Sequence, residues 1–235
     1  MVLSLTSVQV KLANNTLAVF SPTALTPEVR SILKSPVAYI TCPDIEHHIY
    51  LTDWARAFPD AKVLGPAGLP EKRESDASTA GIKFSHVWTA KNKYDMRVDD
   101  VFDKEFDVEF VHTHGNKELV FCHRPSRTLI EADLMFNLPA GEQYSRTSDG
   151  AGGGLLVRMF TSLMSIQGSA VWQKRFLWYA ASARGREEFN LSVRRINKWD
   201  WDAIVPCHGD VIETGGKGIF RKVFEWHLEG QERGN

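Results

Sequence analysis

One short turn constrains the fold most, because it gathers metal-binding side chains between a strand and a helix. Residues 37–40 form an apolar, β-type run, and residues 49–58 have the apolar spacing of an amphipathic helix. The turn between them, residues 41–48, reads T-C-P-D-I-E-H-H. Strand-to-helix turns of this kind are where open α/β sheets usually bind ligands. The sequence therefore predicts an α/β protein with a candidate site on this turn.

The turn has two interpretations. Five of its side chains can ligate a metal: Cys42, Asp44, Glu46, His47 and His48. Asp and Glu also cap helices, and a histidine can pack in a core, so a purely structural turn is the alternative. Five such groups between apolar flanks favour the metal-binding interpretation.

Three later strands also end on metal-capable side chains. We expect these strands at residues 106–113, 128–132 and 203–207, from their alternating or short apolar patterns. The side chains at their ends are, in chain order, His112 with His114, then Asp133, then His208. A single histidine after a strand is usually a core or capping residue. Together with the first turn, however, these strand ends predict ligands that converge at one edge of two sheets.

The remaining pattern is a mixture of short strands and helices. Other expected strands are an opening hairpin at 8–12 and 17–20, and segments 61–64 and 118–123. Other expected helices are one that starts after Thr26 and those at 155–166, 172–183, 186–199 and 219–228. The polar residues 71–80 are expected to be a solvated surface, and 82–89 and 96–102 have no clear pattern. The glycine-rich residues 150–154 lack the lysine and leading strand of a phosphate-binding loop.

Composition is that of a soluble globular protein that does not bind nucleic acid. The chain has 235 residues, 43% hydrophobic and 24% charged, which predicts a single domain over residues 1–235. The formal net charge of −1 gives no electrostatic footprint for nucleic acid or an anionic membrane. We find no signal peptide and no apolar run that could span a bilayer. The three widely spaced cysteines indicate a reducing, cytoplasmic location.

The order of the four strand-end sites resembles the metallo-β-lactamase fold superfamily. That superfamily has an H-x-H-x-D-H motif, then a histidine, an aspartate and a late histidine, each closing a strand. The corresponding segments here are Cys42-Pro43-Asp44-Ile45-Glu46-His47, His112-Thr113-His114-Gly115-Asn116, Glu131-Ala132-Asp133 and His208-Gly209-Asp210. In the first motif only His47 keeps the family residue. The D-I-E-H-H string and residues 121–137, F-C-H-R-P-S-R-T-L-I-E-A-D-L-M-F-N, resemble a branch known mainly as a domain of unknown function.

The resemblance implies a fold, a metal centre and a reaction class. The fold is a four-layer αββα sandwich, with a helical insert at about residues 150–185. One metal would be held by Glu46, His47, Asp133 and His208, and a second by Cys42, Asp44, His112 and a bridging Asp133. His114 is an alternative to His112, and Cys42 could instead be a buried, inert thiol. Zinc is the first expectation, but the carboxylate-rich set also suits manganese or iron.

The resemblance also implies catalysis by a metal-activated water. The expected activity is hydrolysis of a small ester, thioester, lactone or amide. A degenerate member with a redox, lyase or binding role is the alternative, because the first motif is altered and a fold does not fix an activity. Candidate catalytic groups are Asp44, Glu46 and His48, and candidate substrate-binding groups are His114, His123 and Trp172. The expected partner is a small molecule, with a homodimer left open.

Overall fold

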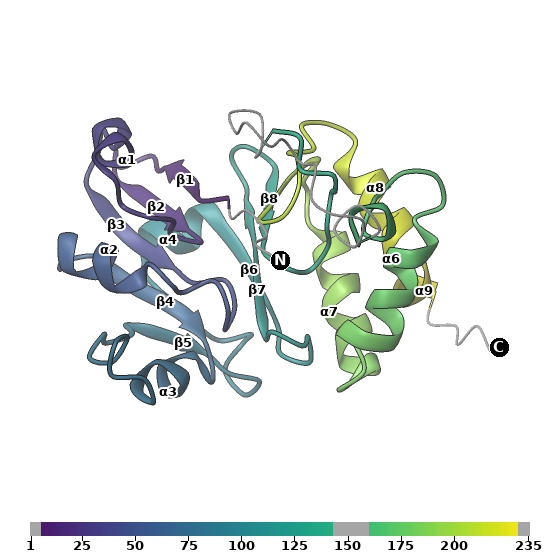
Figure 1. Ribbon diagram of the computed structural model, residues 1–235, viewed down its shortest axis with the longest axis horizontal. Coiled ribbons are helices and arrows are strands. Elements are labelled where there is room, and N and C mark those ends of the chain that lie inside the picture. Colours follow the sequence, from purple (N-terminus) through teal and green to yellow (C-terminus); the bar gives the residue numbers. More distant parts are fainter. Residues whose placement is uncertain (1–5, 143–159, 230–235) are drawn as a thin grey trace.

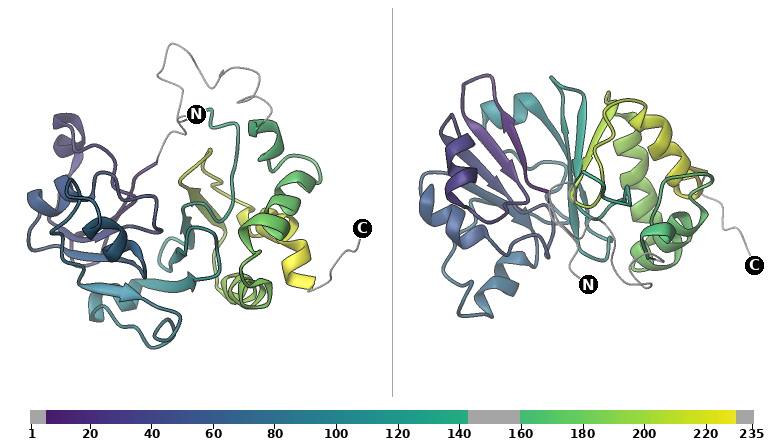
Figure 2. Two further views of the ribbon diagram at one scale, coloured as in Figure 1. Left: turned by 60° about the horizontal axis from the view of Figure 1, so that its bottom comes forward. Right: turned by 45° about the horizontal axis from the view of Figure 1, so that its top comes forward.

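Two β-sheets face each other and helices cover both outer faces, as Figure 1 shows. The structure is a computed structural model that describes residues 6–142 and 160–229. In the two further views of Figure 2, the purple-to-blue N-terminal half and the green-to-yellow helices stay on opposite sides of the molecule. The expected four-layer αββα sandwich is confirmed.

The first sheet contains five strands in chain order. They are β1 (Val8–Lys11), β2 (Leu17–Phe20), β3 (Val37–Thr41), β4 (Lys62–Pro66) and β5 (His86–Trp88). β1 and β2 pair antiparallel as the predicted hairpin, and β2 to β5 run parallel. Asn15 has a φ of 63° in the hairpin turn, a conformation that asparagine tolerates better than most residues. Parallel β3 and β4 end at the same edge, so the turn after β3 lies at that edge.

The second sheet contains four strands, also in chain order. They are β6 (Phe106–Val111), β7 (Glu118–His123), β8 (Thr128–Glu131) and β9 (Ala203–Pro206). β6, β7 and β8 form the predicted antiparallel meander, and β9 pairs parallel to β8. The ends of β6, β8 and β9 and the start of β7 therefore lie at one edge of this sheet.

The outer layers are made of short helices. They are α1 (Pro27–Ile32), α2 (Leu51–Ala57), α3 (Leu69–Glu74), α4 (Asp100–Glu105), α6 (Val171–Phe176), the π-helix η1 (Leu177–Ala181), α7 (Arg186–Lys198), α8 (Gly216–Val223) and α9 (Glu225–Glu229). The start of α1 was predicted: the Thr26 side chain accepts the Val29 N–H, and Pro27 occupies the first turn. Of these helices, α6, α7, α8 and α9 group on the outer side of the second sheet (Figure 1).

Aromatic side chains fill the layer between the sheets. Phe20 of β2 lies against Phe106 and Phe121 of the second sheet, with ring centroids 5.4 and 4.9 Å apart. A second core packs α7, α8 and α9 on the other face of the second sheet, and a third packs α2 on the first sheet. The two sheets are thus held face to face, which brings their strand ends together.

Some expectations about local structure are wrong. Residues 71–80 are mostly exposed, as expected, but the helix α3, which begins at Leu69, was not expected, and its Arg73 is 1% exposed. Arg73 is buried because its guanidinium donates to the His48 carbonyl, the Thr52 hydroxyl and the Thr79 carbonyl. The helix expected at 172–183 divides into α6 and η1, and that expected at 219–228 divides into α8 and α9.

Part of the expected helical insert lies outside the described residues. Of the helix expected at 155–166, residues 160–163 are helical, and α6 and η1 form the rest of the described insert. The glycine-rich residues 150–154 also fall outside the described part. The single-domain organisation over 1–235 stays a prediction. In the described ranges, none of the helices combines the length and the apolar character needed to cross a membrane.

A buried histidine in the helical layer predicts acid sensitivity. His227 is 1% exposed, and its Nδ1 lies 2.8 Å from Oδ1 of Asn190. Burial, with Arg186 nearby, lowers the pKa of His227 to about 3. The unfolded chain protonates this histidine near pH ~6.5 and the folded chain does not, so stability is lost as pH falls. We expect a loss of about 2 kcal/mol by pH 5 from this group.

Urea unfolding of the wild type and of His227→Gln at pH 7 and pH 5 measures this loss. The glutamine cannot titrate but can still donate to Asn190, so the variant should lose less stability between the two pH values. An equal loss in both proteins would show that His227 is not responsible.

Candidate metal centre

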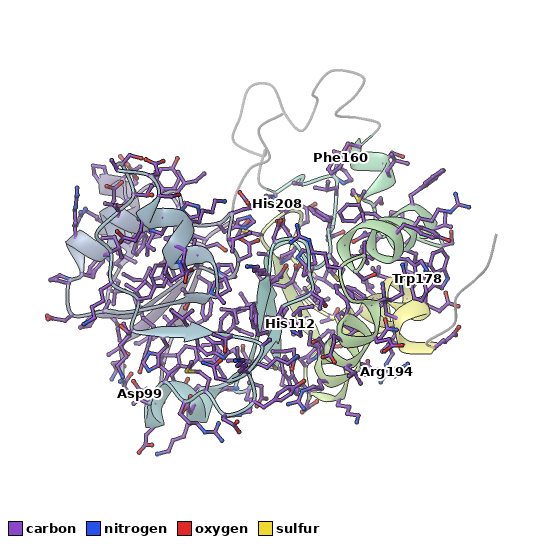
Figure 3. The ribbon with its side chains drawn as sticks, turned by 90° about the horizontal axis from the view of Figure 1, so that it is seen from below. Asp99, His112, Phe160, Trp178, Arg194 and His208 are labelled. Carbon is purple, nitrogen blue, oxygen red and sulfur yellow. The ribbon has the colours of Figure 1, made fainter. Side chains whose placement is uncertain are left out.

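Three of the predicted ligands meet at one point. Nε2 of His47 lies 3.2 Å from Nε2 of His208, which lies 3.3 Å from Oδ1 of Asp133. One donor atom from each of the three residues lies within 4.8 Å of the other two. His47 and His208 are buried, and Asp133 is half-buried. Figure 3 labels His208 near the middle of the molecule, between the two halves.

The topology explains why these three residues meet. Asp133 follows β8 and His208 follows β9, and parallel neighbouring strands end at the same edge of their sheet. His47 follows β3 of the facing sheet. Beyond the strands, the Asn137 N–H donates to the His208 carbonyl, and Phe136 stacks on the His208 ring with centroids 5.8 Å apart. Asp133 and His208 lie 86 and 161 positions after His47 in the chain. Strand pairing brings Asp133 and His208 together, and the packing of the two sheets brings His47 to them.

The distances fit a shared metal ion. Two donor atoms bound about 2.1 Å from one ion, at right or tetrahedral angles, lie about 3.0–3.4 Å apart. The contacts of 3.2 and 3.3 Å fall in this range. Two histidines and one carboxylate with further open positions are also a common catalytic donor set for zinc and for non-haem iron.

Asp44 orients His47 instead of joining the cluster. Oδ2 of Asp44 lies 2.8 Å from Nδ1 of His47, and its Oδ1 accepts the backbone N–H groups of Glu46 and His47. Burial lowers the pKa of His47, but the hydrogen bonds and charges of Asp44 and Cys207 together outweigh burial and raise the pKa to about 12. A carboxylate behind a histidine is the usual partner of a metal-ligating imidazole, because it turns the other ring nitrogen toward the ion.

Negative charge accumulates around the cluster. Four carboxylates lie in this region: Asp44, Glu118, Glu131 and Asp133. Burial and repulsion from Asp44 and Asp133 raise the pKa of Glu118 well above its usual value. Among the described residues, no lysine or arginine forms an ion pair with any of the four. Oε1 of Glu131 is buried and has no hydrogen-bond partner among the residues that the structure describes. A bound cation would favour the ionised form of these carboxyl groups, so the residues present fit a divalent metal.

Two groups that the sequence interpretation missed hold Asp133 in place. Glu118, at the start of β7, accepts the N–H groups of Ala132 and Asp133 at 2.8 and 2.9 Å. Nδ2 of Asn116 donates to Oδ2 of Asp133 at 2.5 Å. Burial raises the pKa of Asp133, but the His208 hydrogen bond and the His47 charge outweigh it, so the pKa falls to about 2. Glu118 gave no signal in the sequence, because it stands at the start of a strand and not at a strand end.

The structure does not bring Cys42, Glu46 and His48 into the cluster. The Cys42 side chain packs in the core under α2, where burial raises the pKa of its thiol. Glu46 points outward to Lys72 of α3, with Oε1 2.8 Å from Nζ, and its side chain is 54% exposed. Nδ1 of His48 lies 3.1 Å from Nη1 of Arg73, also in α3. Residues of α3, a helix that was not predicted from the sequence, thus bind Glu46 and His48, two of the side chains that were expected to be ligands or catalytic groups.

Of His112 and His114, the structure places His114 nearer the cluster, although His112 was the first expectation. His112 is turned toward Lys93, with its Nδ1 3.5 Å from Nζ, and Figure 3 shows it apart from His208. His114 is 3% exposed and lies beside the cluster, with Nδ1 3.9 Å from Oε2 of Glu118. Burial lowers the pKa of His114, which favours the neutral, metal-binding form. His114, and not His112, therefore lies near the cluster, but it does not belong to the group formed by His47, Asp133 and His208.

The other two expected substrate-binding residues lie elsewhere. His123 is at the far end of β7 from Glu118, where it pairs with Phe106 at the start of β6. Trp172 is 52% exposed on α6, and Arg175 stacks on its ring at 4.8 Å. The geometry places neither beside the cluster.

A family model described as a domain of unknown function, DUF4336, matches residues 2–144, which is more than half of the chain. The chain belongs to the DUF4336 family. The matched region of this DUF4336 protein includes His47, Glu118 and Asp133. A search of curated proteins gave no match.

Solved structures confirm the resemblance in fold. A metallo-β-lactamase from Pontibacter korlensis matches with a TM-score of 0.50 and 11% identity, over 96% of this chain and 94% of its own. The Flv1 flavodiiron core from Synechocystis matches with a TM-score of 0.62 and 13% identity, over 96% of this chain and 53% of its own. A flavo di-iron protein from Thermotoga maritima matches with a TM-score of 0.57 and 12% identity, over 98% of this chain and 55% of its own.

These matches establish the metallo-β-lactamase fold for the DUF4336 chain, and nothing finer, because all the identities are low. The chain spans about half the length of the flavodiiron proteins it matches. Because the same fold occurs in hydrolases and in redox proteins, a choice between these two activities must be argued from the residues of the site.

Proposed function

We propose that this protein is a metal-dependent hydrolase with one divalent ion held by His47, Asp133 and His208. The proposed substrate is a small ester, thioester, lactone or amide, and the proposed location is the cytoplasm. The observation that carries the proposal is the convergence of three donor atoms, with contacts of 3.2 and 3.3 Å, from three strand ends. One ion is proposed instead of two because Cys42 and His112, expected to hold the second, face away from the centre.

The chain's own residues prepare the site. Asp44 fixes the tautomer of His47 so that Nε2 faces the cluster, and Asn116 occupies Oδ2 of Asp133 so that Oδ1 remains for the ion. Glu118 holds the backbone of Asp133 in position. When bound, a divalent ion with open positions acts as a Lewis acid on a carbonyl oxygen and lowers the pKa of water. Zinc is our first choice for this ion, and iron or manganese would also fit the set.

A redox role on the same scaffold is the second candidate. It is favoured by the higher TM-scores of the flavodiiron structures and by a carboxylate-rich environment, which suits iron. Iron retained through purification, with a visible absorption that changes on reduction, would favour this role over hydrolysis.

Activity of two matched acidic variants tests the hydrolase proposal. Zinc-loaded protein would be assayed against nitrophenyl esters, thioesters, lactones and amides. Asp133→Asn should lower kcat/KM by at least about 100-fold, because it weakens a ligand with little change in shape. Glu46→Gln should stay within about twofold, because Glu46 only pairs with Lys72 at the surface.

Absence of hydrolysis in every substrate class by the loaded wild type would overturn the proposal. Equal activity in the two variants would also overturn it, because the carboxylate placed at the centre would then not matter.

A further inference from the structure

A second reactive arrangement lies at the opposite edge of the second sheet. β7 begins at Glu118, beside the candidate metal centre, and ends at His123. Five residue steps along a strand cover about 16 Å. The family-matching string H-R-P-S-R-T continues from His123 through the turn to β8, and the proposed metal chemistry makes no use of it.

In this turn a serine, a histidine and a glutamate form a hydrogen-bonded chain. Oγ of Ser126 lies 2.7 Å from Nδ1 of His123, and Nε2 of His123 lies 3.2 Å from Oε2 of Glu105. His123 and Glu105 are buried, whereas Ser126 is exposed. A solvent-facing hydroxyl backed by a buried imidazole and a buried carboxylate is the arrangement that activates serine nucleophiles on unrelated folds.

The hydrogen bonds define the tautomer of His123. Oε1 of Glu105 accepts the Ala13 N–H at 2.9 Å, so both carboxylate oxygens act as acceptors. His123 must then donate from Nε2, which leaves the lone pair of Nδ1 directed at the Ser126 hydroxyl. The Ser126 hydroxyl also lies 2.9 Å from Oγ1 of Thr128, to which it can donate, so its proton must turn from Thr128 to Nδ1 of His123 when the serine reacts. Because the free nitrogen faces the hydroxyl, His123 is already oriented as a general base.

The turn is held rigidly on both sides of the serine. Nη1 of Arg124 lies 2.6 Å from Asp107 of β6, and the Arg124 N–H donates to the Glu105 carbonyl. Nη2 of Arg127 lies 2.7 Å from Asp200. A fixed backbone keeps the hydroxyl in place before a reagent arrives, which is a requirement for a nucleophile.

We propose that Ser126 is an activated nucleophile that accepts acyl groups from activated esters, with His123 as its base and Glu105 as the positioning residue. Oγ forms a bond to the acyl carbon, the bond from that carbon to the leaving oxygen breaks, and the hydroxyl proton passes to Nδ1 of His123. The protonated imidazole then donates this proton to the leaving alkoxide. The step needs no metal and no oxidant, so it is independent of the proposed hydrolase centre.

Covalent labelling of the full-length protein tests this proposal. The wild type would be treated with a fluorophosphonate and, separately, with p-nitrophenyl acetate, and the modified residue located by peptide mass spectrometry. We expect one adduct, at Ser126. The wild type should label at the same rate with and without a metal chelator, so this result stays separate from failure of the metal proposal.

Four variants identify the roles. Ser126→Ala should abolish the adduct, whereas Ser78→Ala should not, because the exposed Ser78 hydroxyl donates to Asp76 and has no histidine partner in the described part of the chain. His123→Gln should slow labelling by about 100-fold. Glu105→Gln should slow it by at least about tenfold while the thermal midpoint shows that the protein is folded.

Two results would overturn the proposal. One is a wild type that gives no adduct, or an adduct elsewhere, with either reagent. The other is a folded His123→Gln variant in which Ser126 is labelled as fast as in the wild type. That result would mean that Ser126 reacts only because it is exposed, and that the hydrogen bonds to His123 and Glu105 serve only to stabilise the turn.

Discussion

Replacing Gly209 with alanine is expected to destabilise the protein by about 3–5 kcal/mol. Gly209 has a φ of 127°, a conformation that other residues rarely adopt. A Cβ there would lie 2.3 Å from the Asn137 carbonyl oxygen and 2.7 Å from the Asn137 nitrogen. Both are backbone atoms, so neither can move aside as a side chain would. The clash also moves the preceding residue, His208, so metal affinity should fall as well.

Thermal unfolding measures this effect, and we expect the midpoint to fall by about 10 °C. Gly218→Ala is the matched control. Gly218 lies in α8 with nothing within 4 Å of its ideal Cβ, so alanine should raise stability by up to about 1 kcal/mol. Similar midpoints for the two variants would contradict the close packing of Gly209 on Asn137.

Replacing Phe121 with alanine should cost about 3–5 kcal/mol. Phe121 is 0% exposed in the middle of β7, and its ring centroid lies 4.9 Å from that of Phe20 and 6.3 Å from that of Phe102. The change opens a cavity in the layer that joins the two sheets, because strands on both sides limit collapse. The facing sheets carry the proposed metal ligands, so the same change should also weaken the proposed metal binding.

Urea unfolding of Phe121→Ala tests the cost, with Leu191→Ala as control. Leu191 is 46% exposed on α7, and its loss should change stability by less than about 0.5 kcal/mol. A cost for Phe121→Ala as small as that of the control would mean that the sheets are not packed as described.

The strands were predictable because alternation and turn residues are local signals. β6, β7, β8 and β9 were placed within two residues of their ends, and the resemblance then gave the layer order. Short elements were not predictable: α4 has six residues and β5 has three, too few for a period to show. α3 was missed because its sequence is polar, and the partners that bury Arg73 are up to 25 residues away.

The candidate centre was half predictable. The strand ends predicted that His47, Asp133 and His208 would converge, and the structure brings these residues together. Their role as metal ligands stays a prediction. The direction of the neighbouring side chains was not predictable, because it depends on other layers. Cys42 faces the core under α2, and Lys72 and Arg73 of α3 hold Glu46 and His48.

The most direct test of the single-metal account is metal content. Protein without a histidine tag, purified without chelators, would be examined by elemental analysis beside His208→Ala and Glu46→Gln. We predict about one equivalent of one divalent metal in the wild type and in Glu46→Gln, and a loss of at least about tenfold in affinity in His208→Ala. No metal in the wild type, even after reconstitution with zinc, manganese and iron, or equal affinity in all three proteins, would contradict the account.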